Sequence, residues 1–178
     1  MIIQRNLPLV EEILSGFSEV IGPDLPGYRN HVYRVINLCF SICDLAEEDR
    51  EKIQVAACFH DIGIWTAGTL DYLPPSESVA ATYLMARGKD DWVPEVVEMI
   101  GMHHALRQTR SPFPWVEPFR RADIADFSLG LVPMGMDRAL IKRLKAEFPN
   151  AGFHRRLAQL GSKWLLRHPL RPLPMFRW

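Results

Sequence analysis

The stretch ACFHDIGIW, residues 57–65, places a histidine and an aspartate side by side at the end of an apolar run. The run begins near Glu48, and its apolar residues recur every three or four positions, which predicts a helix over about residues 48–62. Gly63 follows, and glycine commonly ends a helix. Because the backbone can turn there, we expect His60 and Asp61 to face one point. A lone His-Asp dipeptide arises easily by chance, so the rest of the chain must decide its role.

Helical spacing of apolar residues dominates on both sides of this stretch, and the alternation typical of β-strands is nearly absent. A turn at residues 24–27 precedes a helix expected over about residues 28–46. Ser76 is expected to cap the next helix, which ends near Gly88. Further helices are expected over about residues 91–105 and 118–129, after a cap at Asp137, and over about residues 152–167. The sequence therefore predicts an all-α, globular helical bundle without internal repeats.

Length and composition favour one domain that spans residues 1–178. Lys plus Arg and Asp plus Glu are equal at 21 each, so no net field favours a nucleic-acid duplex or an anionic membrane. No apolar run approaches the roughly 20 residues that a membrane span needs. The start lacks the apolar segment of a signal peptide, and we expect a cytoplasmic protein. Cys39, Cys43 and Cys58 lie in apolar stretches and are expected to be buried free thiols.

Four of the six histidines fall on or beside the apolar stripes of three expected helices: His31, His60, His103 and His104. One such residue is usually a hydrogen-bonded core histidine, because an unpaired buried polar group is costly. Several on different helices favour convergence on a metal. Asp123 lies four positions from both Phe119 and Phe127, where a carboxylate is rarely buried unless paired or metal-bound. Asp126 is the competing candidate for the buried carboxylate, but the helix face on which it lies is less apolar than that of Asp123.

With these residues the sequence resembles the HD-domain phosphohydrolases. NHVYRV carries His31, ACFHDIGIW carries His60 and Asp61, and RRADIADF carries Asp123. The family pattern is a histidine on an early helix, a His-Asp pair ending the next, and a distant aspartate on a later helix. The resemblance covers about residues 28–129. It implies an HD-domain core over about residues 28–130, followed by C-terminal helices and an extended tail over residues 131–178.

The resemblance also implies a metal held by His31, His60, Asp61 and Asp123. Two imidazoles and two carboxylates suit one divalent transition ion, such as Mn, Fe, Co, Ni or Zn. Such an ion lowers the pKa of bound water towards about 7 in favourable cases and offsets charge on phosphoryl oxygens. We therefore expect hydrolysis of a phosphate ester in a small phosphorylated molecule, such as a nucleotide. A homo-oligomer is left open.

Two carboxylates are candidates for the general acid that protonates the leaving oxygen, beside Asp61 at the metal itself. They are Asp71, in the loop after the His-Asp pair, and Glu77, at the start of the next helix. The alternative is that Asp71 is only a turn residue and that Glu77 only stabilises its helix by interacting with the positive end of the helix dipole.

Three further residues are candidates for substrate binding. His103 or His104 could bind phosphate or the metal's water, or the two could simply form a helix-end pair stabilised by the dipole. Arg34 could hold phosphate oxygens, although most helix arginines are solvated.

Departures from the family pattern leave two other functions open. Dinuclear HD enzymes have a histidine early in the third helix, where this chain has Pro75, Ser76 and Glu77, so we expect one metal. Apolar Ile64 and Trp65 stand where alarmone hydrolases of this family carry an acidic pair. The first alternative is an HD-type iron oxygenase, with Glu77 or His104 completing a second iron site. The second is a non-enzymatic module that binds a nucleotide or a partner protein and keeps a structural metal.

Overall fold

A computed structural model describes residues 2–42, 44–170 and 174–175. No β-strand occurs among these residues, so the expected all-α class is confirmed. Within the same segments, no helix is both long and apolar enough to cross a membrane. The elements in chain order are α1 (Pro8–Gly16), α2 (Ser18–Ile21), η1 (Gly22–Asp24), α3 (Leu25–Phe40), α4 (Glu47–Phe59), α5 (Gly63–Thr66), α6 (Leu73–Met85), η2 (Asp90–Trp92), α7 (Val93–Met102), α8 (Val116–Phe127), α9 (Arg138–Glu147) and α10 (Phe153–Arg167).

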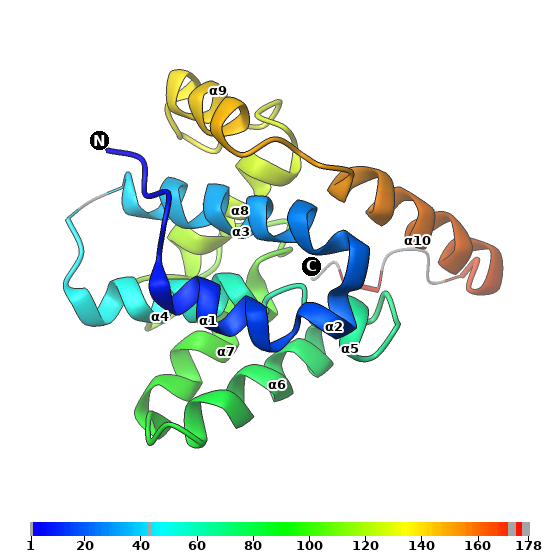
Figure 1. The fold of residues 1–178 in the computed structure, drawn as a ribbon, viewed down its shortest axis with the longest axis horizontal. Coiled ribbons are helices and arrows are strands. Elements are labelled where there is room, and N and C mark those ends of the chain that lie inside the picture. Colours follow the sequence, from blue (N-terminus) through cyan, green and yellow to red (C-terminus); the bar gives the residue numbers. More distant parts are fainter. Residues whose placement is uncertain (1, 43, 171–173, 176–178) are drawn as a thin grey trace.

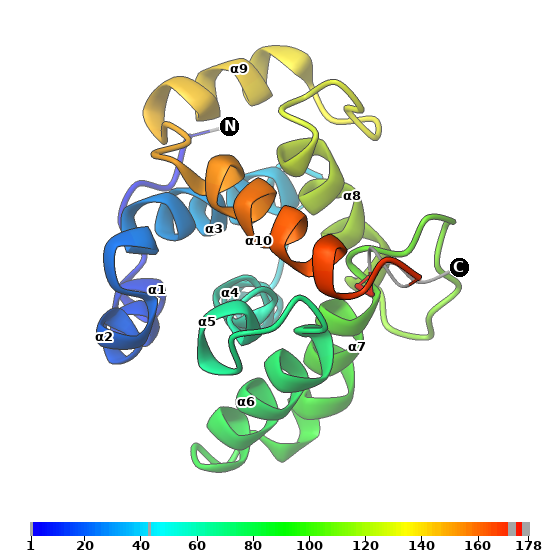
Figure 2. The ribbon, with the colours of Figure 1, turned by 90° about the vertical axis from the view of Figure 1, so that its right-hand side faces the viewer.

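The bundle is organised around α3 and α4, which pack against each other in the middle of the molecule (Figure 1). α3 also contacts α8 and α9, and α4 also contacts α1, α6 and α7. The α6–α7 pair lies at one end of the molecule and α9 at the other. Figure 2 shows α10 passing in front of α3 and α8, and α10 contacts α3.

The buried position of α3 explains why polar residues on it need partners. Every residue from His31 to Phe40 is buried, including three polar ones. Asn37 accepts a hydrogen bond from the backbone N–H of Gln4 at 2.8 Å, and Arg34 and His31 both bond Asp126. A buried polar group without such a partner is destabilising, so these contacts fix how α3 sits in the core.

The helix around the His-Asp pair ends differently from the expectation. α4 stops at Phe59, a turn carries His60 and Asp61, and Gly63 begins α5 instead of ending a helix. The backbone N–H of Gly63 donates to Ser76 Oγ at 2.9 Å. A Cβ at Gly63 would lie 2.4 Å from the carbonyl oxygen of Tyr72. Glycine is therefore required here because the start of α6 approaches so closely.

Ser76 does not cap α6, contrary to the expectation. α6 begins three residues earlier at Leu73, with prolines in its first turn where their missing N–H is not needed. α3 likewise begins earlier than expected, with Pro26 in its first turn, and ends at Phe40. The cap predicted at Asp137 is confirmed, because its Oδ1 accepts from the N–H of Ala139 at 2.9 Å.

The N-terminal helices have no counterpart among the expected ones. α1 buries Val10, Ile13 and Leu14. Cys39 and Cys58 are buried free thiols as expected, whereas Cys43 lies outside the described residues. The expectation of an extended tail concerns residues of which 171–173 and 176–178 lie outside the described part of the chain.

Candidate metal centre

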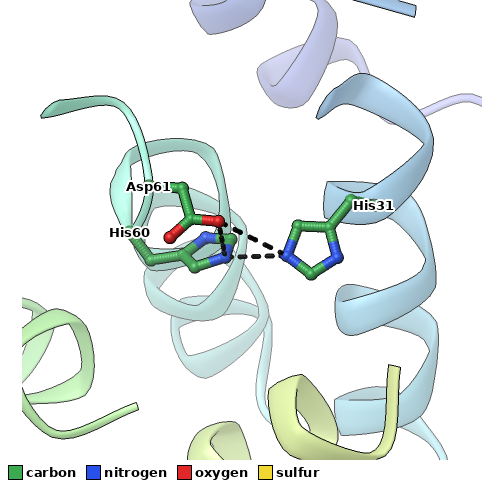
Figure 3. A group of neighbouring side chains, drawn as sticks. All are labelled: His31, His60 and Asp61. Atoms are coloured by element: carbon green, nitrogen blue, oxygen red, sulfur yellow. Dashed lines mark hydrogen bonds and ion pairs between the residues drawn. The ribbon is translucent and has the colours of Figure 1, made fainter. Parts of the chain in front are cut away.

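Three helical elements bring the four predicted metal ligands together. His31 comes from the middle of α3, His60 and Asp61 from the turn after α4, and Asp123 from α8. Figure 3 shows His31 pointing across to His60 and Asp61. All four residues are at most 4% exposed, although each has a polar or charged side chain. Such a group is stable in a core only when each member has a partner.

The distances between these ligand atoms, 2.9 to 3.8 Å, are close to those expected around one ion. Nε2 of His31 lies 2.9 Å from Nε2 of His60, and 3.4 Å from Oδ1 of Asp123. Nε2 of His60 lies 3.4 Å from Oδ2 of Asp61. With metal–nitrogen bonds of about 2.1 Å, neighbouring ligand atoms stand roughly 3.0 to 3.4 Å apart. A divalent ion would therefore fit between these atoms with little movement.

Hydrogen bonds on the far side of each imidazole orient the rings. Nδ1 of His31 donates to Oδ2 of Asp126 at 2.7 Å, and Nδ1 of His60 donates to the carbonyl oxygen of Ala57 at 2.8 Å. A proton held on Nδ1 leaves the lone pair on Nε2 for a metal, which is the usual arrangement of metal-binding histidines.

Several buried polar atoms of this group lack a hydrogen-bond partner. They are Oδ1 of Asp61, Oδ2 of Asp123 and Nε2 of His103. Three such atoms in one cluster would be costly in a core without a ligand. The donor set of imidazole nitrogen and carboxylate oxygen suits divalent transition ions, so the residues present fit a metal.

His103 and His104 also reach this group from the end of α7. Nε2 of His103 lies 3.5 Å from Oδ1 of Asp61, and Nδ1 of His104 lies 3.8 Å from Oδ2 of Asp123. Ligand atoms of Asp61, His103 and His104 lie within 4.8 Å of one another, as do those of His31, His60 and Asp61. Asp61 belongs to both groups, so the described residues offer a second set of potential ligands beside the first.

The charges of the cluster compensate one another in the metal-free protein. Burial acts to raise the pKa of the Asp61 carboxyl, but His60, His103 and His31 hold it below its usual value. Burial acts to lower the pKa of His31, but Asp123 and Asp126 raise it to about 9. A protonated His31 therefore supplies positive charge in the metal-free fold, and a metal must displace that proton.

His104 differs from the other histidines. Burial, and then the neighbouring His103, lowers the pKa of His104 to about 3. Nε2 of His104 lies 2.7 Å from the hydroxyl of Tyr72, with which it forms a hydrogen bond. His104 is therefore neutral near pH 7.

Asp123 and Asp126 occupy different places, although both are buried. Asp123 faces the Nε2 atoms of His31 and His60, whereas Asp126 lies at the opposite edge of the His31 ring. Arg34, predicted to bind substrate, donates to both carboxylate oxygens of Asp126 and to the carbonyl oxygen of Phe148. The structure therefore places Arg34 behind His31 and does not bring it to the ligand atoms.

The two candidate general acids lie outside the groups of ligand atoms. Asp71 precedes α6, where its N–H donates to Oγ1 of Thr69 at 3.1 Å, and Glu77 lies in the second turn of α6. Both are half-buried. Their role as proton donors stays a prediction.

The family model of the HD domain matches residues 28–140, a span that includes all four predicted ligands. The chain belongs to the HD-domain family. Searches among curated proteins and among solved structures gave no match. The HD-domain match also includes His103 and His104, and it ends within α9, so α10 lies beyond it.

Sequence reasoning missed three residues that surround the centre. The ring of Phe153, the first residue of α10, stacks on His31 with 4.5 Å between ring centroids. Tyr72 bonds His104, and His154 lies beside Phe127 at the end of α8. The DYLPP run and the start of the last helix contain these residues, but no spacing in either segment links them to the distant histidines.

Proposed function

We propose that this HD-domain protein is a metal-dependent phosphohydrolase that cleaves a phosphate ester of a small molecule. In this proposal one divalent transition ion is held by His31, His60, Asp61 and Asp123. The observation that supports it most directly is the cluster of buried ligand atoms without a hydrogen bond, Oδ1 of Asp61 and Oδ2 of Asp123 among them.

The ligands have chemistry suited to this task. Two carboxylates balance the charge of a divalent ion, and the Nδ1 hydrogen bonds hold the imidazoles in place. When bound, such an ion supplies a water of lowered pKa and offsets charge on the phosphoryl oxygens. The buried position of the ligands limits access of bulk water, which strengthens each electrostatic contact inside. Asp71 or Glu77 is proposed to hold the proton for the leaving oxygen.

The test is to load the protein separately with Mn, Fe, Co, Ni and Zn and to measure phosphate release from a library of phosphate esters. His60→Ala and Asp61→Ala are expected to abolish both metal content and phosphate release. His168→Ala removes an imidazole outside the ligand groups and is expected to change neither. Full activity in both ligand variants would contradict the proposal.

One observation favours a second candidate, an iron oxygenase with two ions. Asp61, His103 and His104 form a second group of ligand atoms that shares Asp61 with the first. Two irons per chain with oxygen consumption would support the oxygenase, whereas one ion with phosphate release supports the phosphohydrolase. Tight binding of an unhydrolysed ligand without any turnover would support the non-enzymatic alternative.

A further inference from the structure

A cavity of about 290 Å³ lies beside the metal centre, under the inner face of α10. Its walls come from five segments of the chain, around residues 70–72, 104, 127, 154–161 and 175. Leu157, Ala158 and Gly161 of α10 form one side, and Leu70 and Phe127 contribute to the others. One wall of the cavity is therefore formed by a helix that lies beyond the family match.

His104 connects this cavity to the ligand atoms. Its ring lines the cavity, and its Nδ1 lies 3.8 Å from Oδ2 of Asp123. None of the four proposed ligands lines the cavity itself, so His104 is the residue that borders both the cavity and the ligand atoms. The cavity is the space in which the rest of a substrate could lie.

The polar side-chain atoms in the cavity wall already have hydrogen-bond partners. The hydroxyl of Tyr72 bonds Nε2 of His104 at 2.7 Å. In His154, Nδ1 lies 2.7 Å from Nδ2 of Asn150, and Nε2 lies 2.8 Å from the carbonyl oxygen of Phe127. These hydrogen-bonding atoms are therefore engaged and do not offer partners to a polar ligand.

The wall also lacks charge. Among the described residues that line the cavity, none is Lys, Arg, Asp or Glu. Arg34, behind His31, is bound to Asp126. An additional phosphate inside the cavity would lose its hydration without gaining a cation from these residues, which is strongly unfavourable.

We propose that this cavity binds an uncharged, apolar group of the substrate. The substrate class is then a phosphate monoester of an aromatic or aliphatic alcohol, with its single phosphate at the ligands, and not a nucleoside polyphosphate. The ester part of this inference rests on the proposed function, whereas the binding of an apolar group does not.

Gly161 offers a direct way to fill the cavity. A Cβ at this position meets no atom within 4 Å, so a larger side chain enters open space. Gly161→Leu is therefore expected to occupy the cavity without disturbing the backbone. Ala158→Leu is a second variant from the same wall. Gln159→Leu adds a similar apolar side chain at a neighbouring position that does not line the cavity and is the matched control.

The experiment compares kcat/KM for 1-naphthyl phosphate and glycerol 1-phosphate, and measures binding of 1-naphthol by calorimetry. The wild-type protein is expected to favour 1-naphthyl phosphate. Gly161→Leu and Ala158→Leu are expected to lower kcat/KM for this ester at least about tenfold, the effect of misfitting a few carbons in an apolar pocket. In both cavity variants, activity on glycerol 1-phosphate and metal content are expected to stay unchanged. The Gln159→Leu control is expected to behave like the wild-type protein on both esters.

Failure of the inference and failure of the proposed function give different results. If the wild-type protein hydrolyses esters but prefers glycerol 1-phosphate, or if the cavity variants hydrolyse 1-naphthyl phosphate normally, the inference is wrong and the phosphohydrolase stands. If no ester is cleaved but 1-naphthol binds the wild-type protein and not the variants, the apolar site is supported and the phosphohydrolase is wrong. Absence of 1-naphthol binding to the wild-type protein overturns the apolar site itself.

Discussion

Asp126 accepts a hydrogen bond from Nδ1 of His31 at 2.7 Å and at the same time holds Arg34, whose Nε lies 2.6 Å from the other carboxylate oxygen. The carboxylate thus fixes the proton on Nδ1 and directs Nε2 of His31 towards His60 and Asp123. Its charge is held in the core by Arg34. Asp126 contacts Nδ1 of His31 and not its proposed ligand atom, Nε2. Asp126 therefore sets the orientation of a metal ligand without being one itself.

Asp126→Asn is expected to weaken metal binding about 10- to 100-fold, as loss of such outer partners usually does. The amide cannot hold Arg34 with a full charge, and it accepts the proton of His31 less strongly. The measurement is metal affinity by competition with a chelator. Glu117→Gln is the matched control, because Glu117 likewise holds a buried arginine, Arg120, but forms no bond to a proposed ligand among the described residues. Equal affinities in the two variants would show that Asp126 does not orient His31.

Gly63→Ala is expected to destabilise the protein, because its Cβ would lie 2.4 Å from the carbonyl oxygen of Tyr72. Overpacking of this kind typically costs about 1 to 3 kcal/mol. The measurement is urea denaturation of the metal-free protein. Gly16→Ala serves as the control, because a Cβ at Gly16 meets no atom within 4 Å. A Gly63→Ala variant as stable as the control would contradict the inference that the close approach of α6 requires glycine at position 63.

The stability of the metal-free protein is expected to fall as the pH rises from about 6.5 to 9. In the folded protein, burial acts to lower the pKa of His31, but Asp123 and Asp126 outweigh this effect and raise the pKa from 6.5 to about 9. The protonated ring stabilises the fold fully below pH 6.5, and this contribution is lost as the pH passes the folded-state pKa. Thermal unfolding measured across this range checks it. His31→Gln should remove the His31 contribution to the slope, and an unchanged slope in that variant would count against the assignment.

Asp71→Asn or Glu77→Gln is expected to lower kcat about 10²- to 10⁴-fold on alkyl phosphates if the residue is the general acid. On p-nitrophenyl phosphate, whose leaving group needs no proton, the loss should be small. Metal content should stay unchanged in both variants, because neither residue belongs to the ligand groups. A variant that loses activity equally on both esters is not the general acid.

The sequence was sufficient to predict the all-α class and the convergence of His31, His60 and Asp123. A polar residue on an apolar stripe must find partners in the core, and several such stripes on one small bundle leave few places for them. The preference for Asp123 over Asp126 agrees with the side of His31 on which each lies.

The surroundings of the centre could not be predicted in the same way. The contact between Phe153 and His31 joins residues distant in the chain, and helical spacing carries no information about such pairs. The position of Arg34 also depends on Asp126 of another helix. Helical spacing predicts a helix to about residue 62, whereas α4 ends at Phe59, because the role of Gly63 depends on α6, which packs against α5.

Phe153 links the last helix to the helix that carries the first ligand. Its ring stacks on His31, and its backbone nitrogen would lie 3.2 Å from a Cβ at Gly27, so the start of α10 is seated directly on α3. A chain shortened after residue 140 would keep every proposed ligand and yet lose both the aromatic support of His31 and the roof of the neighbouring space. Exchange of residues along the inner face of α10 therefore offers a route to a new substrate preference while the chemistry at the ligands is retained.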